Sequence, residues 1–169
     1  MTTPAAGRVR PVRPDDVDEV HALVRDLAAY ERSLAAVTST PDDFRAALFG
    51  PGPALFGHVV ETEEGPGRLG GFALWFLSFS TWTGRHGIYL EDLYVRPEHR
   101  GRGFGRALLA ELARTCAEWG YSRLEFSVLD WNAPSLAFYR SIGAVAMDEW
   151  TVHRLSGEAL GRLGDTTAS

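Results

Sequence analysis

The sequence contains little cysteine and no long hydrophobic segment. Its one cysteine excludes an intramolecular disulfide and a cysteine-rich metal site, so we expect a reducing, cytoplasmic location. The longest apolar run, Phe72–Leu77, is far too short to cross a bilayer, and no membrane partner is expected. Met1–Gly7 lacks a charged stretch followed by an apolar one, so we expect no signal peptide.

The sequence also has fewer basic residues than acidic ones. Lysine and arginine together number 17 against 22 aspartate and glutamate residues, which gives a net charge of −5 at pH 7. A basic surface for nucleic acid is therefore not expected. The acidic balance would suit a cationic small molecule, although many cytosolic proteins are mildly acidic without such a partner.

The length and apolar content suit one globular domain. The chain has 169 residues, of which 45% are hydrophobic, and this is enough for a sizeable core. We expect a single domain over 8–163, with loose ends at 1–7 and 164–169.

Periodicity and turn residues predict an α/β fold, a mixed and mostly antiparallel sheet flanked by helices. Helices are expected where apolar residues recur at helical spacing, over 14–30, 41–48, 103–119 and 133–142. Strands are expected over 8–12, 55–62, 69–80, 88–95, 123–129, 144–147 and 150–155. Turns at Glu63–Gly67 and Gly84–Gly87 join three of these strands into a predicted antiparallel meander.

A glycine-rich segment after the strand 88–95 carries the strongest chemical signal. It reads Arg100-x-x-Gly103-x-Gly105 and leads into the strongest helical pattern of the chain. Glycines let the backbone approach a ligand, and the free N–H groups at a helix start favour phosphate oxygens. It is neither a P-loop, which needs Gly-Lys-Ser/Thr, nor a Rossmann loop, which needs glycine where Arg106 stands. The strand–loop–helix context favours anion binding over a turn that only begins a helix.

This segment resembles the acyl-CoA pyrophosphate loop of the GNAT acetyltransferase superfamily, whose fold has the same order of elements. Further segments are similar to the spermidine/spermine (diamine) acetyltransferases, namely Leu27–Glu31, Ser80–Trp82, Tyr89–Val95, Leu129–Asn132 and Phe138–Tyr139. The resemblance implies an N-acetyltransferase that uses acetyl-CoA as co-substrate without a metal. It also implies a small, cationic primary amine as acceptor, and a homodimer.

The resemblance also implies where acetyl-CoA binds. Backbone groups of Leu93, Tyr94 and Val95 would contact the pantetheine arm, and Asn132 and Ser135 would reach the cofactor from the next helix. The pyrophosphate would be held by the loop, which comprises Arg100, Gly101, Arg102, Gly103, Phe104, Gly105 and Arg106. Two departures are visible, because Gly143–Trp150 is shorter than in the polyamine enzymes, and Ile142 replaces an arginine that would contact the cofactor.

Two residues are candidates for catalysis. Tyr139 matches the general acid of the family, and a phenol with pKa near ~10 stays protonated beside a leaving thiol with pKa near ~8.5. The alternative is a core tyrosine on the same helical face as Leu136 and Ile142. Glu91, between apolar neighbours, would be a partly buried carboxylate that attracts the ammonium and relays its proton, or else a solvated strand residue.

Carboxylates and aromatic rings are the groups that would bind a cationic acceptor. The candidates are Tyr30, Glu31, Trp82, Glu91, Asp148 and Glu149, although surface acids are often only solvated. The five histidines show no metal spacing, and Cys116 is expected to be a core thiol, which favours direct attack by the amine. A protein lysine or N-terminal acetyltransferase and a non-catalytic acyl-CoA-binding module remain alternatives.

Overall fold

The computed structural model describes residues 7–63 and 68–165. The chain divides into two compact units, Met1–Ser127 and Val128–Ser169, and each is described by itself. Most of the predicted turn Glu63–Gly67 and of the predicted loose ends lies outside the described residues. The assignment of 8–163 to one domain stays a prediction.

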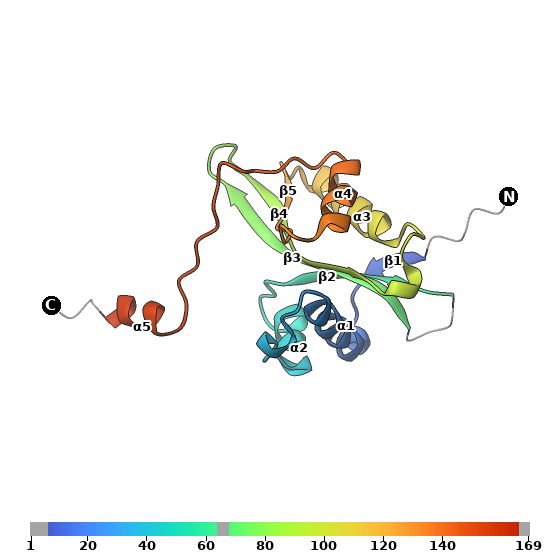
Figure 1. Cartoon of the computed structure of the whole chain (residues 1–169), viewed down its shortest axis with the longest axis horizontal. Helices are drawn as coiled ribbons and strands as arrows, with labels where there is room; N and C mark the ends of the chain where they lie inside the picture. Colours follow the sequence, from blue (N-terminus) through green and yellow to red (C-terminus); the bar gives the residue numbers. More distant parts are fainter. Residues whose placement is uncertain (1–6, 64–67, 166–169) are drawn as a thin grey trace. The chain divides into compact units, whose positions relative to one another are not determined.

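The first unit is built on a five-stranded sheet with the order β1-β2-β3-β4-β5 (Figure 1). Four strands pair antiparallel in chain order, namely β1 (Arg8–Pro11), β2 (Phe56–Glu61), β3 (Leu69–Ser80) and β4 (Arg85–Val95). The short strand β5 (Leu124–Phe126) joins β4 in parallel. The predicted mixed, mostly antiparallel sheet and its central meander are therefore confirmed.

The first unit contains several helices, and capping residues mark the start of two of them. The helices are η1 (Pro14–Asp16), α1 (Val17–Tyr30), η2 (Leu34–Ala36), α2 (Pro41–Phe49), η3 (Pro97–His99) and α3 (Phe104–Trp119). Thr40 and Asp43 form a reciprocal capping box at the start of α2. Helix α3 lies between Gly103 and Gly120, which both adopt the left-handed conformation. None of the helices in the described part of the chain is long and apolar enough to span a membrane.

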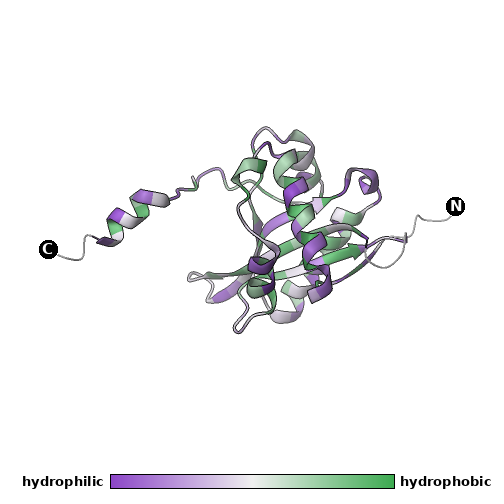
Figure 2. Cartoon of the chain, turned by 90° about the horizontal axis from the view of Figure 1, so that it is seen from below, coloured by the Kyte–Doolittle hydropathy of each residue, from purple (hydrophilic) through white to green (hydrophobic). Residues whose placement is uncertain are grey.

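The main core lies between the sheet and the helices α1 and α2. Figure 1 shows α1 and α2 on one face of the sheet and α3 on the other. Apolar side chains of α1 pack on those of β3 and β4, and in Figure 2 the strands of the sheet are mainly in the apolar colour. This core includes Val17, Val20, Leu23, Leu27, Leu48, Val59, Phe72, Leu74 and Tyr94.

The second unit contains α4 (Ala133–Ser141) and α5 (Gly157–Asp165). The side-chain oxygen of Asn132 accepts a hydrogen bond from the Ser135 N–H at 3.3 Å and caps α4, as predicted. The predicted strands over 144–147 and 150–155 are wrong, because both stretches are irregular and Val145 and Val152 are each 82% exposed. A short run of apolar and β-branched residues becomes a strand only where another strand pairs with it.

Candidate active site

The loop between β4 and α3 has an open backbone surface. Gly101 and Gly103 have φ angles of 74° and 86°, and a Cβ at either position would meet no atom within 4 Å. The first backbone hydrogen bond of α3 runs from the Ala107 N–H to the Gly103 carbonyl at 2.9 Å. The amides before Ala107 therefore have no helical carbonyl to bind, which is the arrangement that holds phosphate oxygens.

One edge of β4 is open beside this loop. Strand β5 pairs only with Ile88, Tyr89 and Leu90, whereas β3 continues to pair with β4 as far as Val95. In the described residues, Leu93–Val95 thus have a paired strand on one side only. An extended chain with amide groups, such as a pantetheine arm, could bind along the other side as an added strand does.

Arg100 is held at the start of the loop by two tyrosines. Its guanidinium carbon lies 5.1 Å from the ring centre of Tyr30 and 5.5 Å from that of Tyr94, and its Nε donates to the Val95 carbonyl at 3.0 Å. Tyr30 is the last residue of α1, so this stack joins that helix to the cofactor loop. Arg106, also predicted to hold the pyrophosphate, is exposed in the first turn of α3.

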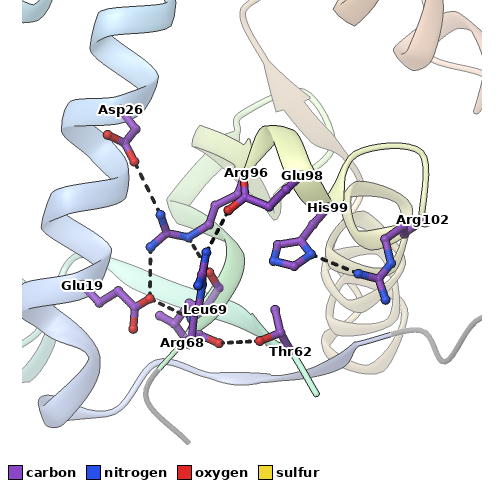
Figure 3. Close-up of polar contacts among 9 residues, drawn as sticks. All are labelled: Glu19, Asp26, Thr62, Arg68, Leu69, Arg96, Glu98, His99 and Arg102. Atoms are coloured by element: carbon purple, nitrogen blue, oxygen red, sulfur yellow. Dashed lines mark hydrogen bonds and ion pairs between the residues drawn. The ribbon is translucent and has the colours of Figure 1, made fainter. Parts of the chain in front are cut away.

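A second arginine connects the same helix to the end of β4. Arg96 donates to the Leu69 carbonyl at 2.8 Å and pairs with Glu19 at 3.1 Å and with Asp26 at 3.8 Å (Figure 3). The Glu19 carboxylate also accepts from the Leu69 N–H at 2.8 Å. These contacts position α1 against the strand ends from which the loop departs.

Three carboxyl groups, those of Glu31, Glu91 and Asp92, lie where α1 ends and where β4 contains a bulge. A β-bulge makes Glu91 the extra residue of β4, because Leu74 pairs with Asp92 and Trp75 pairs with Leu90. Glu91 is exposed rather than partly buried as expected, while Asp92 is half-buried. Burial, together with the smaller effect of the negative charges of Glu91 and Glu31, raises the pKa of Asp92 to about 6.

Asp92 is a candidate functional residue that the sequence reasoning missed. It lies two residues before Tyr94, which packs in the core beneath α1, so its side chain shares that face of the sheet. Burial also raises the pKa of the Glu31 carboxyl at the end of α1. The available signal was an aspartate among apolar residues of a strand, since such a residue is rarely buried without a purpose.

Of the other predicted site residues, Trp82 belongs to the first unit, and Tyr139, Asp148 and Glu149 belong to the second. Trp82, at the turn after β3, is 89% exposed. In the second unit, Tyr139 lies on α4 with its ring centre 5.2 Å from that of Phe138. Asp148 and Glu149 are exposed in a turn closed by a hydrogen bond from the Trp150 N–H to the Met147 carbonyl. Their roles stay predictions.

The thiol and the histidines differ in part from expectation. Cys116 is half-exposed rather than buried, and burial raises the pKa of its thiol, so the thiolate needed for nucleophilic attack is disfavoured. In the part of the chain that the structure describes, no group of His, Cys, Asp and Glu side chains could hold a metal ion. His99 is buried next to the loop.

Known proteins match both this chain and this fold. The model of the Acetyltransferase (GNAT) family matches residues 20–144. A thialysine N-epsilon-acetyltransferase from Bos taurus is 36% identical over 92% of this chain and 95% of its own length. The spermidine/spermine N(1)-acetyltransferase-like protein 1 of Homo sapiens is 31% identical over 90% of this chain and 23% of its own length.

A solved structure supports the fold independently. An integron cassette protein from the mobile metagenome of V. cholerae has a TM-score of 0.76 at 22% identity, over 94% of this chain and 98% of its own. The family model and the two acetyltransferase relatives confirm the predicted resemblance to the superfamily and to its diamine acetyltransferases. The loop, the open edge of β4 and these matches lead to one conclusion: the chain belongs to the Acetyltransferase (GNAT) family and is an N-acetyltransferase.

Proposed function

We propose that the chain transfers an acetyl group from acetyl-CoA to a primary amine of a small cationic acceptor, a polyamine, diamine or lysine-like amino acid. The observation that carries the acceptor class is the trio of carboxyl groups, Glu31, Glu91 and Asp92, at the bend of β4. A relative of this chain is named for acetylating thialysine, a cationic amino acid, and this agrees with the same class of acceptor.

The residues present fit acetyl-CoA. The open backbone at Gly101 and Gly103 and the first amides of α3 would hold its pyrophosphate, and the open edge of β4 would hold its pantetheine arm. Asn132 and Ser135 are further proposed contacts. When bound, acetyl-CoA supplies an acetyl group activated as a thioester.

The carboxyl groups prepare the acceptor. A buried or half-buried carboxylate attracts a second positive charge on the acceptor, and this attraction is stronger where water is partly excluded. With a pKa of about 6, Asp92 is also a better proton acceptor than an ordinary aspartate. The raised pKa of Asp92 reduces the difference from the pKa of the acceptor amine, which is near ~10.4 in water. Glu91, exposed beside Asp92, would relay the proton to solvent.

Tyr139 is the proposed general acid for the departing thiolate. A phenol can donate a proton to a thiolate, and Tyr139 lies on the helix that Asn132 caps. Direct attack by the amine fits a Cys116 thiol whose pKa is raised.

The test is a turnover assay for free CoA with a panel of acceptors. We expect diamines and lysine-like amino acids to exceed neutral monoamines in kcat/KM, and Glu91→Gln to reduce turnover of the cationic acceptors selectively. Glu118→Gln, an exposed carboxylate at the far end of α3, is the matched control. Preference for a lysine peptide would instead indicate a protein acetyltransferase, and CoA binding without turnover would indicate a regulatory module.

We also propose that the protein is a cytoplasmic homodimer. The single cysteine supports the location, and the apolar side chains exposed over 145–152 support a partner copy that covers them. Sedimentation equilibrium should give twice the mass of 18.6 kDa, and a monomeric mass would reject the dimer.

A further inference from the structure

His99 is buried beside the cofactor loop, and none of the roles proposed above uses it. It ends η3 and is 2% exposed. Its ring stacks on that of Phe104, the first residue of α3, with ring centres 5.5 Å apart and an interplanar angle of 21°. The imidazole therefore packs where the loop leaves the sheet and where the next helix begins.

The hydrogen bonding of the ring assigns its proton. The Nδ1 atom lies 3.1 Å from Nη1 of Arg102, as Figure 3 shows. A guanidinium carries only donors, so Nδ1 must be the acceptor, and the ring proton is on Nε2. Nε2 is buried and has no hydrogen-bond partner in the described part of the chain. A buried donor without an acceptor is costly, which indicates that the contact at Nδ1 matters more than satisfying Nε2.

Arg102 is held on two sides by this arrangement. Its guanidinium carbon also lies 5.5 Å from the ring centre of Phe104. Arg102 is the residue between Gly101 and Gly103, whose left-handed conformations create the open backbone surface. Because two of the three residues Gly101–Gly103 are glycines, the backbone of this turn has many accessible conformations. Fixing the one side chain between them restricts that freedom.

We propose that His99 is a positioning residue for acetyl-CoA binding, which acts by holding Arg102 through its unprotonated Nδ1 and so fixes the Gly101–Gly103 turn. The proposal rests on the proposed function of this loop in binding the cofactor. The acceptor atom at Nδ1, rather than the volume of the ring, carries the effect. The consequence is a preformed loop that loses little conformational entropy when the pyrophosphate binds.

Two substitutions separate the acceptor atom from the ring. His99→Asn places an amide oxygen near the position of Nδ1 but removes the stacked ring, while His99→Phe keeps a ring on Phe104 but has no acceptor. We expect His99→Phe to raise the Kd and KM for acetyl-CoA by about tenfold, the scale of one hydrogen bond to a charged group, with kcat nearly unchanged. His99→Asn should stay within about threefold of the wild type. The reverse order would overturn the proposal and make His99 a packing residue.

A double-mutant cycle tests whether His99 acts through Arg102. His99→Phe combined with Arg102→Met should bind acetyl-CoA no more weakly than Arg102→Met alone, because the interaction is already lost. Losses in affinity that add in full would overturn the proposal. If His99→Phe does not fold by urea denaturation, His99→Leu serves in the same cycle at smaller volume.

Calorimetry on the wild-type chain distinguishes this proposal from the proposed function. Absence of acetyl-CoA binding by the wild type would reject the cofactor loop itself. Wild-type binding together with an unaffected His99→Phe variant would reject only the role of His99.

Discussion

The charge of Asp92 should destabilise the folded protein at neutral pH. A variant without this charge should therefore have a larger free energy of unfolding than the wild type. The pKa of Asp92 rises from 3.8 to about 6 on folding because this residue is buried near Glu91 and Glu31. At about 1.36 kcal/mol per pKa unit, this difference corresponds to about 3 kcal/mol. Asp92→Asn, which keeps the shape and loses the charge, should therefore raise the free energy of unfolding by up to about 3 kcal/mol at pH 8.

The pH dependence gives the sign. Between pH 3.8 and about 6, the folded chain keeps a proton on Asp92 that the unfolded chain has released. The contribution of this group to stability therefore falls as pH rises through that window and is constant above it. Below the window the carboxyl is neutral in both states, so Asp92→Asn and the wild type should be nearly equally stable at pH 3.5.

Urea denaturation followed by tryptophan fluorescence at several pH values measures this difference. Glu118→Gln is the control, since it removes an exposed carboxylate, and its free energy of unfolding should be nearly the same as that of the wild type. A diamine should stabilise the wild type more than Asp92→Asn, because the ammonium offsets the buried charge. Equal stability of wild type and Asp92→Asn at pH 8, or a difference that does not change with pH, would refute the reasoning.

Three further substitutions test the loop and the acid. Gly103→Val forces a β-branched residue into a left-handed conformation at φ 86°, so acetyl-CoA affinity measured by calorimetry should fall at least tenfold, and unchanged affinity would contradict the loop assignment. Tyr30→Leu removes one ring of the Arg100 stack, a contact of about 0.5–2 kcal/mol. It should raise KM for acetyl-CoA by between about twofold and about thirtyfold with little change in kcat, and an effect confined to the acceptor would contradict this. Tyr139→Phe should lower kcat by about 10²-fold and leave KM for acetyl-CoA nearly constant, whereas wild-type turnover would leave the acid unassigned.

Elements with local signals could be predicted from the sequence. The bounds of α3 follow from Gly103 and Gly120 and from its apolar stripe, and β3 has the predicted bounds Leu69–Ser80. The glycine-rich loop was predicted for the same reason, since its residues are contiguous. Such features need no knowledge of distant parts of the chain.

Features that depend on pairing could not be predicted. The stretches 144–147 and 150–155 contain apolar and β-branched residues typical of strands, but their sequence does not say whether another strand lies beside them. The bulge at Glu91 shifts the alternation of β4 by one residue, so the sequence alone could not say that Leu90 and Asp92, two residues apart, pair with the neighbouring residues Trp75 and Leu74 and lie on opposite faces. The role inferred for His99 depends on a ring nitrogen that meets Arg102, which only the folded loop brings about.

The basic side chains that anchor the loop, Arg96, Arg100 and Arg102, are all guanidinium groups, and the printed sequence contains no lysine at all. A guanidinium stays protonated at any physiological pH and offers no lone pair to a thioester, whereas a lysine amine releases its proton readily when it is partly buried. An enzyme that prepares amines for acetylation would be exposed to acetylating its own lysines near a bound acyl donor. Because arginine takes the place of lysine throughout the sequence, no lysine side chain of this chain can become its own acceptor. Any acetyl group that mass spectrometry finds on the protein is therefore attached to a residue other than lysine. In a turnover assay, none of the free CoA can come from acetylation of the enzyme's own lysines.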